Sequence, residues 1–97
     1  MISWSPNLSR MASYKIEWKS SAGKELRTLP KAIIPEIVDR VAHLADDPFP
    51  PGSKKLAGAE HTYRIRFSSY RVIYTVSREN RLVEIIRVGH RQSVYKR

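Results

Sequence analysis

The second half of the chain contains three strand-like segments, at about residues 61–67, 70–77 and 82–88, and apolar and polar residues alternate in the first two. A two-residue period is typical of strands that turn one face toward a core. Ser68-Ser69 and Glu79-Asn80 separate these segments, and such short polar breaks are typical of hairpin connections. The alternation therefore predicts a three-stranded antiparallel meander, around which the rest of the chain must pack.

The first half predicts one strand and two helices. Alternation over residues 14–18 indicates a half-buried strand, and residues 20–29 fit a short helix. Apolar residues then recur at helical spacing over residues 33–45, with Pro35 best placed at the first helical position, or else a bent start near Lys31. This order predicts an α+β domain: an N-terminal strand, a helical hairpin and the meander, forming one sheet with the helices on one face.

The length of 97 residues corresponds to a single domain. Residues 1–12 mix Ser, Pro and Asn without periodicity, so we expect a flexible tail there, with Met11 as an alternative start. The folded domain is then residues 13–97. Because the chain has neither a membrane-length apolar run nor the pattern of a secretory signal, we expect a cytoplasmic protein.

The positive charge is concentrated in one half of the sequence. The chain has 18 Lys and Arg against 9 Asp and Glu, and residues 49–97 hold 11 of the basic but only 3 of the acidic residues. Eight of those 11 are Arg, which binds phosphate through two parallel hydrogen bonds more readily than Lys does. The asymmetry favours a polyanionic partner, nucleic acid first and an acidic protein second, over a merely solvated basic surface.

Several other chemistries find no support in the sequence. The absence of Cys excludes disulfides, thiolate catalysis and Cys-containing zinc sites. His43, His61 and His90 lack the spacing of metal ligands, and the four glycines form no phosphate-binding loop. We therefore expect neither a metal nor a cofactor.

A two-residue turn at Ser68-Ser69 would place Arg66 directly opposite Arg71 in the hairpin. Strand alternation then puts Arg64 on the same face as these two, and an aromatic set that includes Tyr63 and Tyr74 on the face toward the helices. Like charges directly opposite one another destabilise a sheet unless an anion lies between them. The pattern favours a phosphate clamp, although long Arg side chains that splay into water would also fit.

The last strand and the residues after it leave alternatives open. Both alternating sets of residues 82–88 are largely apolar, so Arg87 fits either a binding site or a structural role. Gly89 permits a turn, His90 titrates near neutral pH, and Tyr95 carries a phenol. His90 and Tyr95 also each fit a purely structural role.

The chain resembles the RelE/ParE superfamily of bacterial type II toxins in a series of short motifs. These are Lys55-Leu-Ala-Gly, Tyr63-Arg-Ile-Arg, Tyr70-Arg-Val-Ile-Tyr, Ile86-Arg-Val-Gly-His-Arg and the final Tyr95. The front half is similar too, in Tyr14-Lys-Ile-Glu-Trp, Lys24-Glu-Leu-Arg-Thr-Leu-Pro-Lys and Leu44-Ala-Asp-Asp-Pro. The resemblance covers about residues 13–95 and implies the fold of that superfamily.

The RelE branch, favoured because the basic and aromatic residues match it, implies metal-free cleavage of mRNA in the ribosomal A site. The resemblance implies catalytic roles for Arg64, Arg66, Arg71, Arg91 and Tyr95, and our own hypothesis adds His90 to the catalytic set. In our hypothesis Arg71 clamps the scissile phosphate, Arg66 and Arg91 share its charge, and Tyr95 or His90 moves protons. Further contacts to RNA are expected from Lys54, Lys55, Arg87, Lys96 and Arg97. Arg64 and Arg66 stand where the family often has lysine, and Arg hardly ever loses its proton, so the general base stays open.

The resemblance also implies partners: a small, partly acidic antitoxin, and the 70S ribosome with its mRNA and ribosomal RNA. Two other functions remain as alternatives. One is inhibition of DNA gyrase, as in the ParE branch, and the other is binding of nucleic acid or protein without catalysis.

Overall fold

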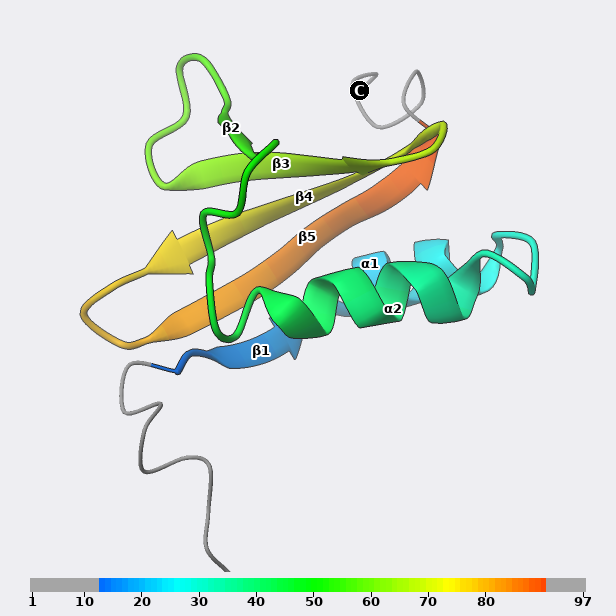
Figure 1. The fold of residues 1–97 in the computed structure, drawn as a ribbon, viewed down its shortest axis with the longest axis horizontal. Helices are drawn as coiled ribbons and strands as arrows, with labels where there is room; N and C mark the ends of the chain where they lie inside the picture. Colours follow the sequence, from blue (N-terminus) through cyan, green and yellow to red (C-terminus); the bar gives the residue numbers. More distant parts are fainter. Residues whose placement is uncertain (1–12, 91–97) are drawn as a thin grey trace, which may run out of the picture.

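The computed structural model describes residues 13–90, which form two helices and a five-stranded sheet (Figure 1). The elements are β1 (Lys15–Trp18), α1 (Ser20–Arg27), α2 (Ile34–His43), β2 (Lys54–Lys55), β3 (Thr62–Phe67), β4 (Tyr70–Ser77) and β5 (Leu82–His90). The expected tail of residues 1–12 lies outside the described residues. The α+β class and the order of strand, helices and meander are confirmed.

The sheet has the order β1-β5-β4-β3-β2, so the first strand pairs with the last. β1 runs parallel to β5, with Lys15 opposite Leu82 and Trp18 opposite Ile85, whereas the other pairs are antiparallel. The two-residue strand β2, which the sequence did not predict, adds a fifth strand beside β3. β5, β4 and β3 are the inner strands, and β4 and β5 carry much of the core, with β4 at the centre of the sheet.

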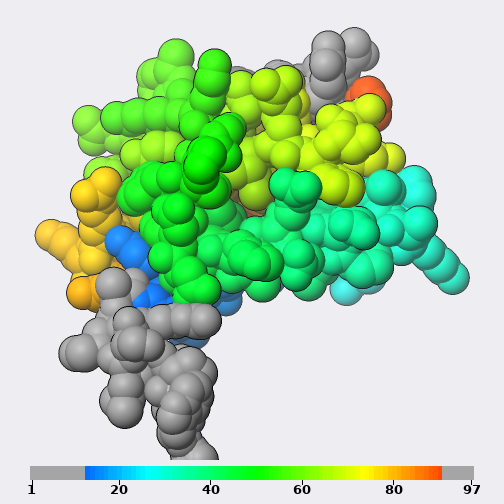
Figure 2. Space-filling view, in the orientation of Figure 1, coloured from blue at the N-terminus to red at the C-terminus, as the bar shows by residue number. Residues whose placement is uncertain are grey.

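Both helices pack on one face of this sheet. The buried cluster unites Ala22 of α1 and Ile37, Val41 and Leu44 of α2 with apolar side chains of β3, β4 and β5. The loop that follows α2 crosses the same face toward β2 (Figure 1). In the space-filling view, α2 and this loop cover the middle of the face, with the β3–β4 hairpin beside them (Figure 2). The helices are therefore confined to one side and leave the opposite face of the sheet to other side chains.

Tyr74 fixes the loop after α2 to the sheet. Its buried hydroxyl donates a hydrogen bond to the carbonyl oxygen of Pro48 at 2.8 Å, and burial raises the pKa of this phenol to about 12. Tyr63 stacks on Tyr74 at 6.0 Å between ring centroids, and Phe49 meets Tyr63 edge-on at 4.9 Å. The aromatic set predicted for the helix-facing side of the hairpin thus holds the loop in place.

A register shift in β5 resolves its ambiguous sequence pattern. Ile85 pairs with Tyr74 while Arg87 pairs with Ile73, so Ile86 is an extra residue in the ladder. The shift lets Val83, Ile85 and Val88 all reach the core, which strict alternation would not allow. It also puts Arg87 on the face away from the core.

The two hairpin connections differ from each other. Ser68-Ser69 is the expected two-residue turn, with Ser68 at a φ of 57°. The connection between β4 and β5 is longer than expected, because Ser77 pairs with Leu82 and four residues lie between them.

None of the helices within residues 13–90 is long and apolar enough to cross a membrane.

Candidate active site

The strand register places five basic residues on the sheet face that points away from the core. Directly opposed residues of neighbouring strands share a face. One row across β2, β3, β4 and β5 consists of Lys54, Arg64, Ile73 and Arg87, and the next consists of Arg66, Arg71 and Gly89. We call the surface formed by Lys54, Arg64, Arg66, Arg71 and Arg87 the arginine face. Its three central arginines are the ones that the predicted hairpin register brought together, and that register is confirmed.

The three central arginines differ in burial. Arg71, on the middle strand, retains only 9 % of its exposure, whereas Arg66 at the edge is exposed. Arg64 is half-buried, and its Nη1 is buried without a hydrogen-bond partner among residues 13–90. A buried donor without a partner costs about 1–3 kcal/mol. An anionic oxygen bound at this face would remove that penalty.

Arg66 and Arg71 are direct cross-strand neighbours of like charge. Like charges directly opposite one another destabilise a sheet, whereas a pair of opposite charges stabilises it by roughly 0.2–1 kcal/mol. Gly89 lies opposite Arg71 on the other side and contributes no side chain there. Two neighbouring guanidinium groups suit a bound phosphate, because they donate paired hydrogen bonds to its oxygens.

Arg87 belongs to the arginine face by register but is held by an acidic residue of α1. Its Nε donates to Oε2 of Glu25 at 3.0 Å, and the backbone N–H of Val88 donates to Oε1 of the same carboxylate at 2.9 Å. Both side chains of the ion pair are about one-third exposed. Arg87 is therefore structurally anchored at the margin of the arginine face.

The structure separates His90 from the arginines. His90 pairs with Tyr70, and the two rings meet edge-on with their centroids 6.0 Å apart. Tyr70 packs against the core, so alternation directs His90 toward the helix side, one residue beyond Gly89. Lys55 is likewise separated, since it pairs with Tyr63 on the helix side. Arg91, Tyr95, Lys96 and Arg97 lie outside the described residues.

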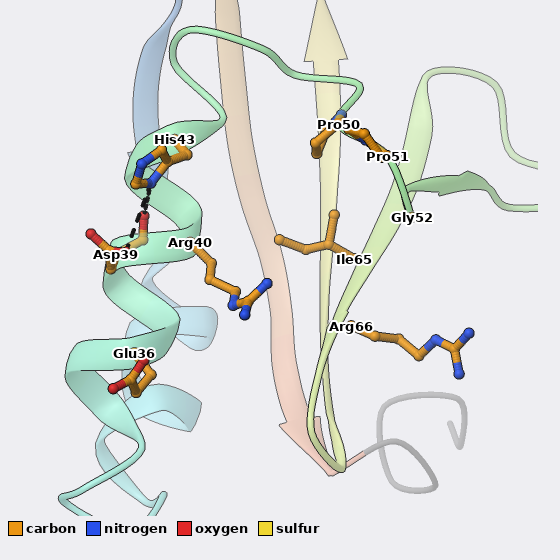
Figure 3. A pocket seen from close by; sticks show the side chains of 9 residues that line it. All are labelled: Glu36, Asp39, Arg40, His43, Pro50, Pro51, Gly52, Ile65 and Arg66. Carbon is orange, nitrogen blue, oxygen red and sulfur yellow. Dashed lines mark hydrogen bonds and ion pairs between the residues drawn. The ribbon is translucent and has the colours of Figure 1, made fainter.

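A groove of about 400 Å³ lies between α2 and β3 (Figure 3). Glu36, Asp39 and His43 line its helix wall, and Ile65 points into it from the strand. Arg66 stands at its margin and points away from α2 (Figure 3). Arg40 extends toward the sheet, where its guanidinium lies 4.6 Å from the centre of the Phe67 ring. The groove therefore has a partly acidic wall and is distinct from the arginine face.

Within residues 13–90 no group of three or more His, Asp or Glu side chains is arranged to hold a metal ion. The charged groups gathered on the arginine face are cationic. What they offer chemically is stabilisation of negative charge on a bound anion.

A family model for the ParE toxin of the parDE type II toxin–antitoxin system matches residues 16–95. The chain belongs to this toxin family. Among curated relatives, the toxin RelG of Mycobacterium tuberculosis is 31% identical over 88 residues, which cover 87% of this chain and 98% of RelG. The chain is thus a RelE-type toxin of a toxin–antitoxin system, as its motifs implied.

Solved RelE structures share the fold. The RelBE2 toxin–antitoxin complex of Mycobacterium tuberculosis matches with a TM-score of 0.72 and 29% identity, covering 82% of this chain and 93% of the other. Isolated Escherichia coli RelE matches with a TM-score of 0.71 and 28% identity, covering 80% and 84%. The archaeal RelE–RelB complex of Pyrococcus horikoshii matches with a TM-score of 0.72 and 28% identity, covering 81% and 96%.

Glu25 is the residue of this region that sequence reasoning missed. It is separated from Val88 by 63 positions, and no local pattern links the two. The available signal was weak: Glu25 is an acidic residue between Lys24 and Arg27 in a short basic helix. Only the packing of α1 against β5 shows what it contacts.

Proposed function

We propose that this toxin is an mRNA endoribonuclease that acts in the ribosomal A site and needs no metal ion. The observation that carries the proposal is the arginine face, where buried Arg71 lies between exposed Arg66 and the glycine at position 89. The unsatisfied donor of Arg64 adds a second reason to expect an anion there. A phosphate of an RNA backbone supplies the missing acceptor oxygens.

The proposed reaction is an attack by a ribose 2′-hydroxyl on the adjacent phosphorus. A bond forms between the 2′ oxygen and phosphorus, and the bond to the 5′ oxygen of the next nucleotide breaks. The products are a 2′,3′-cyclic phosphate and a 5′-hydroxyl end. Extra negative charge develops on the phosphoryl oxygens, where fixed guanidinium donors stabilise it, and one such donor is worth about 3 kcal/mol.

Two protons must move in this reaction. One leaves the attacking 2′-hydroxyl, and one reaches the departing 5′ oxygen. Arg64 and Arg66 are unsuitable as bases because guanidinium groups stay protonated. The orientation of His90 toward Tyr70 disfavours it as well. We therefore assign proton transfer to Tyr95, and we assign Arg91 the role of a further donor to the phosphate.

The remaining basic residues would hold the RNA backbone and ribosomal RNA. Lys54 extends the arginine face beyond Arg64, and Arg87 extends it on the opposite side. Lys55, Lys96 and Arg97 complete this set from the sequence. Several of the similar structures are complexes with a RelB antitoxin, so we also propose a cognate antitoxin with an acidic toxin-binding part.

The test is cleavage of a defined mRNA on purified ribosomes, with 5′ ends mapped by primer extension. The wild type should cut only translated message, and Arg71→Ala should reduce the rate by at least about a hundredfold, as for loss of one transition-state donor. Arg27→Ala is the matched control, because Arg27 is exposed at the end of α1. Equal cleavage by Arg71→Ala and Arg27→Ala would contradict the proposal.

Inhibition of DNA gyrase is the second candidate, favoured by the match to the ParE family model. It predicts DNA damage and a blocked supercoiling reaction with intact mRNA. A gyrase supercoiling assay beside the ribosome assay separates the two functions. If the protein inhibits gyrase and leaves mRNA whole, the nuclease proposal fails.

A further inference from the structure

The outer edge of β5 changes its neighbour halfway along the strand. Residues 82–85 pair with β1, and Lys19 makes the last backbone contact by donating to the carbonyl oxygen of Ile85 at 2.9 Å. The chain then turns into α1 at Ser20. From Val88 onward the edge of β5 faces this helix instead of a strand.

Glu25 takes the place of the missing strand. One carboxylate accepts the backbone N–H of Val88 with one oxygen and the Nε of Arg87 with the other. Hydrogen bonds to an ionised acceptor are stronger than those between neutral groups. A single side chain thus fixes both the backbone and the preceding side chain at the point where the parallel ladder ends.

Val88, which Glu25 fixes, lies next to the residue that pairs with Arg71, the proposed phosphate-binding arginine. Val88 precedes Gly89, which pairs with Arg71, and His90, which pairs with Tyr70. Arg91 and Tyr95 follow directly in the sequence. The position of Val88 therefore sets the packing of β5 beside Arg71.

We propose that Glu25 is a positioning residue for the reaction: it fixes the end of β5 beside Arg71 through the backbone of Val88. This inference rests on the proposed nuclease function. The hydrogen bond to the Val88 backbone should account for most of the effect of Glu25 on the cleavage rate, and the ion pair with Arg87 should account for less of it. Displacement of reacting groups by about 1 Å can lower a rate a hundredfold, so a loose end of β5 should slow the chemical step.

Three variants separate the two contacts. Glu25→Ala removes both, and Arg87→Ala removes only the ion pair and leaves Glu25 to accept from Val88. Glu25→Gln retains one carbonyl oxygen, which can still accept the Val88 N–H, but loses the charge. Glu36→Ala is the control for the change in net charge, since Glu36 is an exposed glutamate on α2.

The experiment measures single-turnover cleavage on programmed ribosomes over a range of toxin concentrations. For Glu25→Ala we expect the rate constant at saturation to fall about tenfold or more, with the half-saturating concentration within about twofold of the wild type. Glu25→Gln should stay within about threefold of the wild-type rate constant, and Glu36→Ala should match it. Arg87→Ala also removes a proposed RNA contact, so its half-saturating concentration should rise, while its rate constant should fall less than that of Glu25→Ala.

Amide hydrogen exchange provides a readout that does not depend on catalysis. The N–H of Val88 should exchange faster in Glu25→Ala but not in Glu25→Gln, relative to core amides of β4. A Gln variant as slow in cleavage as the Ala variant, or an Arg87→Ala variant slower than both, would overturn the backbone role. If the wild type fails to cleave, the proposed function falls and the positioning role with it. If the wild type cleaves and Glu25→Ala cleaves equally well, only the positioning role falls.

Discussion

Replacement of Arg64 by methionine should stabilise the fold while it impairs the toxin. The Nη1 of Arg64 is buried and has no hydrogen-bond partner within residues 13–90, so its desolvation is uncompensated. Methionine fills a similar linear volume without a donor or a charge. Relief of one unsatisfied donor should raise the free energy of unfolding by about 1–2 kcal/mol. For a domain of this size, each 1 kcal/mol shifts Tm by about 4–8 °C.

Arg66→Met is the matched control for this experiment. Arg66 lies two residues along the same strand and on the same face, but its side chain is exposed. Both variants remove one positive charge. Because Arg66→Met also relieves the repulsion between Arg66 and Arg71, the difference between the two unfolding free energies is a lower bound on the effect of the buried donor. Urea titrations at two salt concentrations would measure both, because salt screens the exposed charge more strongly than the buried group.

A second comparison tests whether an anion satisfies Arg64. Inorganic phosphate that binds only the folded protein raises its stability, by about 2.7 kcal/mol at a hundred times the dissociation constant. The wild type should therefore gain more stability from phosphate than Arg64→Met does. If Arg64→Met is no more stable than Arg66→Met, and phosphate stabilises both variants as much as the wild type, the assignment of an anion site is refuted.

Two further predictions concern stability. Tyr74→Phe removes the buried hydrogen bond to Pro48 and should lower the free energy of unfolding, measured in urea, by about 1–2 kcal/mol. Burial raises the pKa of this phenol from 10.0 to about 12, so its contribution to stability is complete below pH 10 and is lost as pH rises toward 12. The stability of the wild type should therefore fall more steeply over that pH range than the stability of the variant. Ser68→Gly should raise Tm, because φ at Ser68 is 57° and this left-handed conformation costs a residue with a Cβ about 1–2 kcal/mol. The greater chain entropy of glycine in the unfolded state offsets part of this gain. An unchanged or lower Tm would contradict that account.

The hairpin from β3 to β4 could be predicted from the sequence almost residue by residue. Its alternation has Ile73 as the main exception, the Ser68-Ser69 break is short, and one face is strongly aromatic, so only one register keeps Tyr63 and Tyr74 in the core. The opposition of Arg66 and Arg71 followed from this register alone. The central part of the candidate site was therefore predictable because it is a local consequence of strand pairing.

The other parts of the site depend on contacts between distant segments. In β5 both alternating sets are apolar, and the extra residue at Ile86, which decides where Arg87 points, leaves no trace in that pattern. The parallel pairing of β1 with β5 joins segments more than sixty residues apart. The contact of Glu25 with Val88 depends on that pairing, because β1 sets where α1 begins. Arg91 and Tyr95 lie outside the described residues, so their roles stay predictions.

The parallel pairing of β1 with β5 also has a consequence for the order in which the protein can fold. β5 supplies Val83, Ile85 and Val88 to the core and is the strand that joins β1 to the meander. Until it has been synthesised, β1 lacks its partner in the sheet and α1 lacks the strand on which it packs. Contacts of such long sequence separation form slowly, because the chain must close a large loop first. A growing chain therefore cannot complete this core, or the arginine face on its reverse, until β5 has been synthesised.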